Sequence, residues 1–155
     1  MKTYYYDVTG ENTATSVFVR DAEVIRAGTT VSSMSPRHRN AVYQQIGVEY
    51  DIHFLFDDAL PEISFYTVPQ VDIFAGDCAG GFLGTLGRCT DFDSDAPICY
   101  IDNEQRCYLA AENGRALLTR KAAWKWELVP YEGIGVYASR EEAEKAHEFL
   151  GKDHL

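Results

Sequence analysis

The stretch that decides the fold is 71-VDIFAGDCAGGFLGTL-86, in which two apolar runs flank a glycine-rich centre. Residues 71–74 and 82–86 are short and contain β-branched and aromatic side chains, a composition typical of strands. The intervening 76-GDCAGG-81 is typical of a tight turn, because glycine adopts backbone conformations that other residues avoid. We therefore predict two consecutive strands joined by this turn.

Further strands are expected on both sides of this unit. Residues 50–56 alternate apolar and polar side chains, and a period of two is typical of a strand with one wetter face. Residues 97–101 and 106–110 predict a hairpin across 102-DNEQ-105. Residues 4–8 and 14–20 are expected to form a second hairpin around the turn Gly10-Glu11-Asn12, and residues 63–68, 124–129 and 134–137 are also expected to be extended.

Four helical segments are expected around these strands. Ser35 and Pro36 supply an N-cap and a first helical residue, and Gly47 is expected to close that helix. Near the C-terminus, 139-SREE-142 is a capping box, and the helix that it opens is expected to end at Gly151. The other two are a helical turn at residues 21–27 and a helix at residues 113–121.

One domain, residues 1–155, accounts for the whole chain, because no repeat or Pro/Gly/Ser-rich linker divides it. Apolar residues make up 46% of the sequence and aromatic residues 13%, which is enough to build a core. Central strands with helices at the flanks predict an α+β fold with a mixed, mostly antiparallel sheet. The N-terminal residues lack the apolar core of a secretion signal, so a cytoplasmic location is expected.

Acidic residues are concentrated in the middle of the chain. The net charge is −10, from 14 Lys and Arg against 24 Asp and Glu. Nucleic acid and anionic membranes repel such a surface, so neither is expected as a partner, and a basic protein is favoured. The alternative is that the acidity only keeps the protein soluble. Between Asn40 and Gln105 the only base is Arg88, and the acids are Glu49, Asp51, Asp57, Asp58, Glu62, Asp72, Asp77, Asp91, Asp93, Asp95, Asp102 and Glu104.

Residues 91-DFDSD-95 resemble the start of a calcium-binding loop, since alternate carboxylates can converge on one cation. The sixth position of such a loop needs glycine, but here it is Ala96 and is followed by Pro97. The twelfth position is Asp102 instead of a bidentate Glu. We therefore expect an acidic surface loop and no metal site.

No catalytic or cofactor motif is recognisable. Asp57 and Asp58 are adjacent, so they are expected to point apart on a solvated turn and not to face one substrate. The conceivable nucleophiles Ser64, Ser94 and Cys78 lack the surrounding motifs of known hydrolases. The four cysteines contain no CxxC pair and are expected to be reduced and structural. We expect neither enzyme activity nor a cofactor.

Two tryptophans, Trp124 and Trp126, would share one face of an extended segment. Core packing is the first interpretation, and a partner-facing hot spot is the alternative. Together with the acidic residues, this gives a hypothetical partner-binding set: Asp77, Asp91, Asp93, Asp95, Trp124 and Trp126.

Features between residues 71 and 118 follow a recognisable order. They are the strand end 73-IFA-75, then Asp77, Gly80 and Gly81, then a strand, an acidic loop, 97-PICYID-102, and a helix with Arg115 and 116-ALL-118. This order resembles the SUKH superfamily, which contains bacterial toxin-immunity proteins and the yeast cell-wall assembly regulator. The resemblance implies a mixed sheet with helices around it, no enzyme activity, and neutralisation of a toxin that is often a nuclease.

The expected function is therefore non-enzymatic binding, in the form of a toxin-neutralising immunity protein that turns an acidic face toward a basic partner. The alternative is a small-ligand-binding or hydrolytic domain that uses carboxylates near Asp77 and at Asp91 to Asp95. A pocket that holds two of these carboxylates with separated pKa values would favour the alternative. A flat or convex acidic face would favour binding to a protein.

Overall fold

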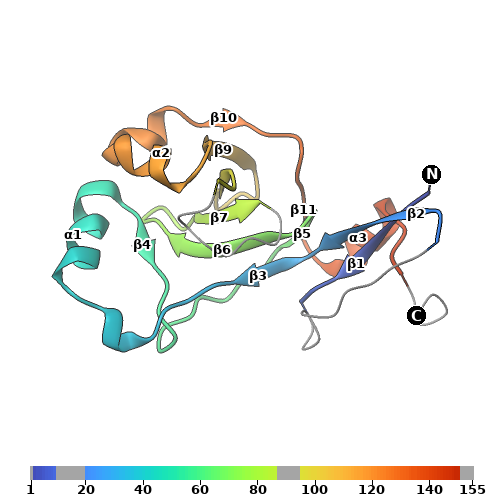
Figure 1. Cartoon of the computed structure of the whole chain (residues 1–155), viewed down its shortest axis with the longest axis horizontal. Helices are drawn as coiled ribbons and strands as arrows, with labels where there is room; N and C mark the ends of the chain where they lie inside the picture. The colour runs from blue at the N-terminus through green and yellow to red at the C-terminus, as the bar shows by residue number, and fades with distance from the viewer. Residues whose placement is uncertain (1, 10–19, 87–94, 151–155) are drawn as a thin grey trace.

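A computed structural model describes residues 2–9, 20–86 and 95–150 of the chain (Figure 1). It confirms an α+β fold with a mixed, mostly antiparallel sheet. The centre of the sheet consists of four antiparallel strands in sequence order, and all four were predicted. They are β6 (Val71–Gly76), β7 (Phe82–Leu86), β8 (Ile98–Ile101) and β9 (Cys107–Ala111).

Shorter strands complete this sheet at its two edges. On one side β10 (Val129–Pro130) pairs with β9. On the other side β6 has two neighbours, which are β3 (Thr29–Val31), parallel to it, and β4 (His53–Phe54), antiparallel to it. Since β3 and β4 come from different parts of the chain, this edge brings residues 29–34 beside residues 53–56.

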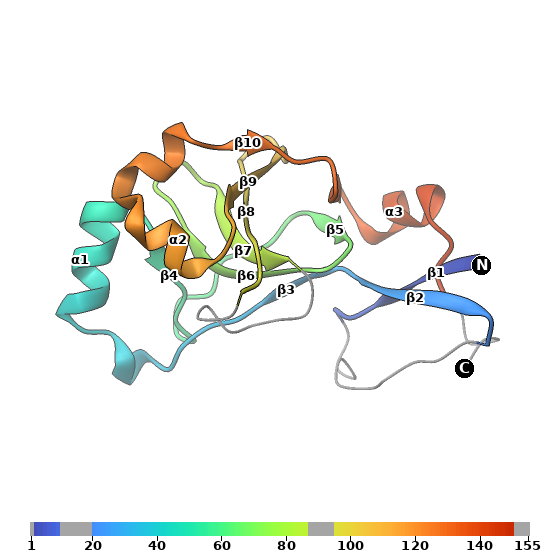
Figure 2. The same ribbon diagram turned by 45° about the horizontal axis from the view of Figure 1, so that its top comes forward.

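Two smaller strand pairs lie beyond the main sheet. β1 (Lys2–Asp7) is parallel to β2 (Ala22–Ala27), and β5 (Tyr66–Val68) is antiparallel to β11 (Gly135–Tyr137). The helix α3 (Arg140–Ala146) packs against β5 and β11. In both ribbon views, β1, β2 and α3 lie at the opposite end of the molecule from α1 and α2 (Figures 1 and 2).

The other helices cover one face of the main sheet. These are α1 (Ala41–Tyr50), α2 (Gly114–Thr119) and the 3₁₀ helix η2 (Lys121–Trp126). A second 3₁₀ turn, η1 (Pro36–His38), precedes α1. Asparagine caps both α-helices, because the side chain of Asn40 accepts the N–H groups of Val42 and Tyr43, and that of Asn113 accepts the N–H of Ala116.

Each face of the main sheet carries its own apolar core. Beneath the helices, Phe74, Leu83 and Ile98 pack against Leu117 and Trp124. The opposite face buries a second set beneath extended segments of the chain, not beneath helices. Its buried members are Leu55, Phe65, Val71, Ile73, Cys99, Ile101 and Ile134.

Three local predictions were wrong. Residues 22–27 form β2 instead of part of a helical turn. β2 pairs in parallel with β1, and residues 14–19 of the predicted hairpin lie outside the described residues. Ser35 and Pro36 open only η1, while α1 begins after Asn40, continues past Gly47 and ends at Tyr50. Residues 121–126, expected to be extended from residue 124, form η2.

The last predicted helix is confirmed at its start. The side chain of Ser139 accepts the N–H of Glu142, as expected of a capping box, and α3 ends at Ala146. The expected end at Gly151 lies outside the described residues. None of the helices in the described part of the chain is long and apolar enough to cross a membrane.

Candidate functional site

Asp51 is the centre of a polar cluster that joins three elements. It directly follows α1, where its positive φ of 54° turns the chain out of the helix. Its carboxylate accepts the backbone N–H of Cys78 (3.0 Å) and the Cys78 thiol (3.0 Å), and it also bonds Nε2 of His53 (2.9 Å) and Nζ of Lys125. The cluster therefore ties the end of α1 to the β6–β7 turn and to η2.

Asp77 is the second carboxylate of this cluster, and its side chain is only 2% exposed. Oδ1 accepts the N–H groups of Gly81 (2.8 Å) and Ala79 (3.2 Å), which fixes the glycine-rich turn. Oδ2 accepts the Tyr100 hydroxyl (2.7 Å) and lies 3.2 Å from Nζ of Lys125. Glycine is required at position 81, since a Cβ there would lie 2.2 Å from the Tyr100 hydroxyl.

The electrostatics of the cluster do not activate its thiol. Burial alone would raise the pKa of Asp51, but hydrogen bonds from Cys78, Lys125 and His53 outweigh it and lower this pKa to about 2. The hydrogen bond to Asp51 raises the pKa of the Cys78 thiol, although Lys125 opposes this change. A cysteine attacks as the thiolate, so a protonated Cys78 that donates to a carboxylate is a poor nucleophile. The geometry suits a clamp between structural elements.

The hypothetical partner-binding residues lie in different environments. Trp124 is fully buried, and its indole N–H donates to the backbone oxygen of Tyr50 (2.7 Å), whereas Trp126 is 85% exposed. The two tryptophans therefore do not share a face. Asp77 is buried and ion-paired, and Asp95 is exposed and ion-paired with Arg115 (2.7 Å). Asp91 and Asp93 lie outside the described residues.

Two further acidic motifs have structural partners. Asp57 accepts the hydroxyl of Ser33, while Asp58 forms an ion pair with Arg39 (2.6 Å), so the adjacent carboxylates point to different groups. Asp102 accepts the N–H groups of residues 104 and 106 and shapes the β8–β9 turn. Within the described residues, no group of three or more His, Cys, Asp or Glu is arranged to hold a metal ion.

Ion pairs formed by the fold neutralise part of the acidic charge of residues 40–105. Bases from outside this segment pair with six of its carboxylates in the described part of the chain, and Asp72 is buried. The pairs are Arg39 with Asp58, Lys125 with Asp51 and Asp77, Arg106 with Asp102 and Glu104, and Arg115 with Asp95. Glu49, Asp57 and Glu62 are exposed, and none of them pairs with a Lys or Arg of the described residues. We call these three the unpaired carboxylates.

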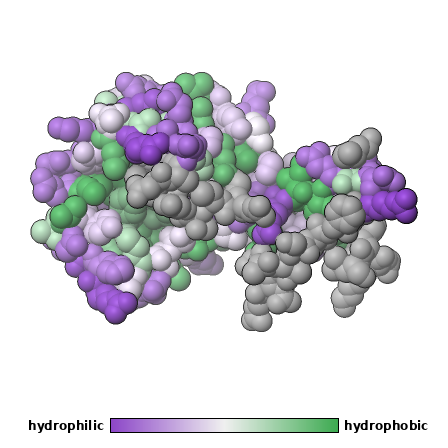
Figure 3. Space-filling model, in the orientation of Figure 1, coloured by the Kyte–Doolittle hydropathy of each residue, from purple (hydrophilic) through white to green (hydrophobic). Residues whose placement is uncertain are grey.

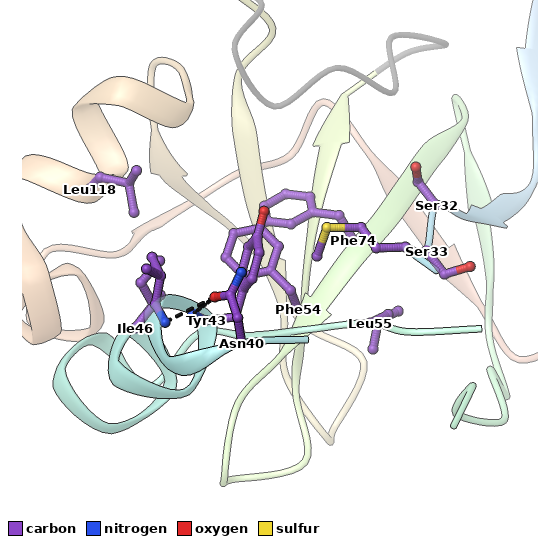
Figure 4. A pocket seen from close by; sticks show the side chains of 11 residues that line it. Ser32, Ser33, Asn40, Tyr43, Ile46, Phe54, Leu55, Phe74 and Leu118 are labelled. Atoms are coloured by element: carbon purple, nitrogen blue, oxygen red, sulfur yellow. Dashed lines mark hydrogen bonds between the residues drawn. The ribbon is translucent and has the colours of Figure 1, made fainter. Parts of the chain in front are cut away.

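A cavity of about 540 Å³ opens beside α1, on the helix-covered side of the sheet edge (Figure 4). Its wall is mainly apolar and combines segments far apart in sequence. Aromatic rings of Tyr43, Phe54 and Phe74 pack successively, with ring centroids 5.5 Å and 5.7 Å apart. The other lining residues are Ser32, Ser33, Met34, Asn40, Val42, Ile46, Leu55 and Leu118.

Two of the unpaired carboxylates, Glu49 and Asp57, lie next to residues that line this cavity. Ser33 lines the cavity and donates its hydroxyl to Asp57, and Glu49 lies one helical turn beyond the lining residue Ile46. Figure 3 shows apolar surface among hydrophilic residues on the side of the molecule where α1 lies in Figure 1. We refer to this cavity together with residues 40–64, which carry five carboxylates and no Lys or Arg, as the α1 site.

A second hollow, of about 360 Å³, lies between β4 and the β6–β7 turn. Asp77 lines it together with His53, Phe56 and Phe82, and no other carboxylate belongs to its described lining. The described carboxylate that converges with Asp77 is Asp51, and Nζ of Lys125 contacts both, but Asp51 does not line this hollow, so the two do not face one substrate there. Asp91 and Asp93 are outside the described residues.

Comparison with known proteins adds no relative: no family model, no curated protein and no solved structure matches the chain. The resemblance of residues 71–118 to the SUKH superfamily therefore stays a prediction.

The sequence analysis did not predict the α1 site. Val42 and Ile46 have helical spacing, which is typical of the core-facing side of any amphipathic helix and does not by itself indicate a cavity. Phe54 was placed on a strand, but nothing in the sequence shows that Tyr43 and Phe74 pack on its two sides. The signal that could have indicated it is that residues 40–64 contain most of these apolar side chains together with five carboxylates and no Lys or Arg.

Proposed function

We propose that this chain is a non-enzymatic binding protein that recognises a basic protein partner at the α1 site. One observation carries the proposal: a mainly apolar cavity is lined in large part by residues 40–64, a segment that has five carboxylates and no Lys or Arg. Protein interfaces commonly combine an apolar centre, which supplies affinity, with a charged rim, which selects the partner and speeds association.

The balance of charge at this site supports a basic partner. Lys125 compensates Asp51, and Arg39 compensates Asp58. Of the unpaired carboxylates, Asp57 bonds the lining residue Ser33 and Glu49 follows the lining residue Ile46 on α1, so these two leave negative charge beside the cavity. The net charge of −10 adds a longer-range attraction for cationic proteins.

The finer form of the proposal is neutralisation of a basic toxin such as a nuclease. A nuclease must hold phosphate with Lys and Arg, so an acidic inhibitor can compete for the same surface. The resemblance of residues 71–118 to the SUKH superfamily points in the same direction. The competing function, hydrolysis at carboxylates near Asp77, has less support because Asp77 is buried and each of its oxygens already accepts protein donors.

Selection from a displayed library of random peptides tests the proposal, because such a library offers basic, acidic and neutral sequences alike. Peptides that bind the full chain are expected to be enriched in Lys and Arg over the unselected library. The variant Glu49→Gln/Asp57→Asn/Glu62→Gln should lose much of this enrichment. The matched control Glu23→Gln/Glu132→Gln/Glu141→Gln removes the same charge from exposed positions elsewhere and should keep it. Neutral or acidic selected peptides would overturn the proposal.

A further inference from the structure

We infer that the cavity of the α1 site receives an aromatic side chain of the partner, flanked in the partner's sequence by Lys or Arg. This inference rests on the proposed function and adds the chemistry of the residue that anchors the complex. It makes the cavity the energetic centre of the interface and the unpaired carboxylates its rim.

The size and lining of the cavity favour an aromatic occupant. Its volume of about 540 Å³ is within the range of about 300–1,000 Å³ that is typical of pockets for drug-sized ligands, so it has room for an aromatic side chain. The rings of Tyr43, Phe54 and Phe74 offer edges and faces to a further ring, an arrangement that stabilises aromatic clusters beyond the burial of area. Ile46 and Leu118 close the wall with aliphatic groups (Figure 4).

The polar groups around the cavity favour cations beside that ring. The described lining contains no charged side chain, so a charged group is not expected inside. At the rim, Asp57 is held by its hydrogen bond from Ser33, and Glu49 projects from α1. A Lys or Arg next to the anchoring aromatic residue can reach these carboxylates while its own charge stays in water.

The helix α1 offers a matched pair of positions for the experiment. Val42 lines the cavity and is 63% exposed, whereas Val48 is 86% exposed and does not line it. Val42→Trp places a large side chain at the cavity without disturbing the buried core, and Val48→Trp is the control on the same helix. Leu118→Trp obstructs the cavity from α2 and serves as a second variant, and thermal unfolding of each variant verifies that it folds.

The probe is the tightest peptide from the random library, measured by fluorescence anisotropy against each variant. We expect it to contain an aromatic residue next to Lys or Arg. Val42→Trp and Leu118→Trp should weaken its binding at least about tenfold, and Val48→Trp by no more than about twofold. Replacing the aromatic residue of the peptide by Ala should weaken binding to the wild-type chain to a similar extent.

The outcomes separate the two levels of the proposal. If basic peptides bind equally well to Val42→Trp and Val48→Trp, the cavity is not the anchor site, and the inference is wrong while the proposed function stands. If the selected peptides are apolar without Lys or Arg, both are wrong, and the cavity instead takes a neutral ligand. If the aromatic residue can be removed without loss of affinity, the inference is wrong.

Discussion

Replacing Asp51 by Asn tests whether the polar cluster is a structural clamp. The hydrogen bonds from Cys78, Lys125 and His53 outweigh the effect of burial and lower the pKa of Asp51 from 3.8 to about 2. One pKa unit corresponds to about 1.4 kcal/mol, so the ionised carboxylate contributes roughly 2 kcal/mol to stability at neutral pH. In a chain of this length, that loss lowers the Tm by roughly 5 °C.

The pH dependence distinguishes this mechanism from a general loss of packing. Because the pKa is lower in the folded state, the stabilisation is present above pH 4 and is lost as the pH falls through about 2. Urea unfolding should therefore show that the free energy of unfolding of Asp51→Asn is lower than that of wild type at pH 7, and that this difference shrinks toward pH 2. The exposed Asp57→Asn serves as control and should change the free energy of unfolding by less than about 0.5 kcal/mol. If the loss of free energy of unfolding in Asp51→Asn stayed constant from pH 7 to pH 2, the reasoning would be refuted.

Four further substitutions test other parts of the fold by thermal or urea unfolding. Burial raises the pKa of Asp72, although the hydrogen bond from Thr30 opposes this effect. The folded state therefore prefers the neutral carboxyl, so the protein is most stable with respect to this group below pH 4 and loses stability as the pH rises. Asp72→Asn should therefore be more stable than wild type at neutral pH and equal to it at pH 3; a less stable variant at pH 7 would contradict this. Trp124→Ala should cost about 3–5 kcal/mol, but Trp126→Ala less than about 0.5 kcal/mol. Equal effects would show that the two tryptophans have similar surroundings. Gly81→Ala should destabilise by about 1–3 kcal/mol because its Cβ meets the Tyr100 hydroxyl, and a neutral result would refute the tight approach.

The sequence predicted the strands β6 to β9 because each of their signals is local. Short apolar runs are joined by turns with recognisable chemistry, and neighbouring strands in sequence are neighbours in the sheet. The parallel pairs β1–β2 and β3–β6 were not predicted, since their partners are chosen by contacts between distant segments. The segment Ala22–Ala27 has no residue pattern that separates a strand from a helical turn, and tertiary pairing decides its state.

The candidate site was even less accessible to sequence reasoning. Asp51 and Lys125 are 74 residues apart, and no spacing rule connects them. The cavity of the α1 site combines Ser33, Tyr43, Phe54, Phe74 and a residue of α2. The concentration of acidic residues was visible in the sequence, but their pairing with bases from outside the segment depends on the fold.

The association rate of a basic peptide tests the central claim most directly. The triple variants at the unpaired carboxylates and at Glu23, Glu132 and Glu141 both change the net charge from −10 to −7, so they differ only in where charge is removed. We expect the first variant to bind the selected peptide roughly tenfold more slowly than wild type at low salt, and the second nearly as fast as wild type. The difference should vanish at 1 M salt, where the Debye length is about 3 Å. Equal association rates for the two variants at low salt would contradict the account, because the negative charge would then have the same effect wherever it lies on the surface.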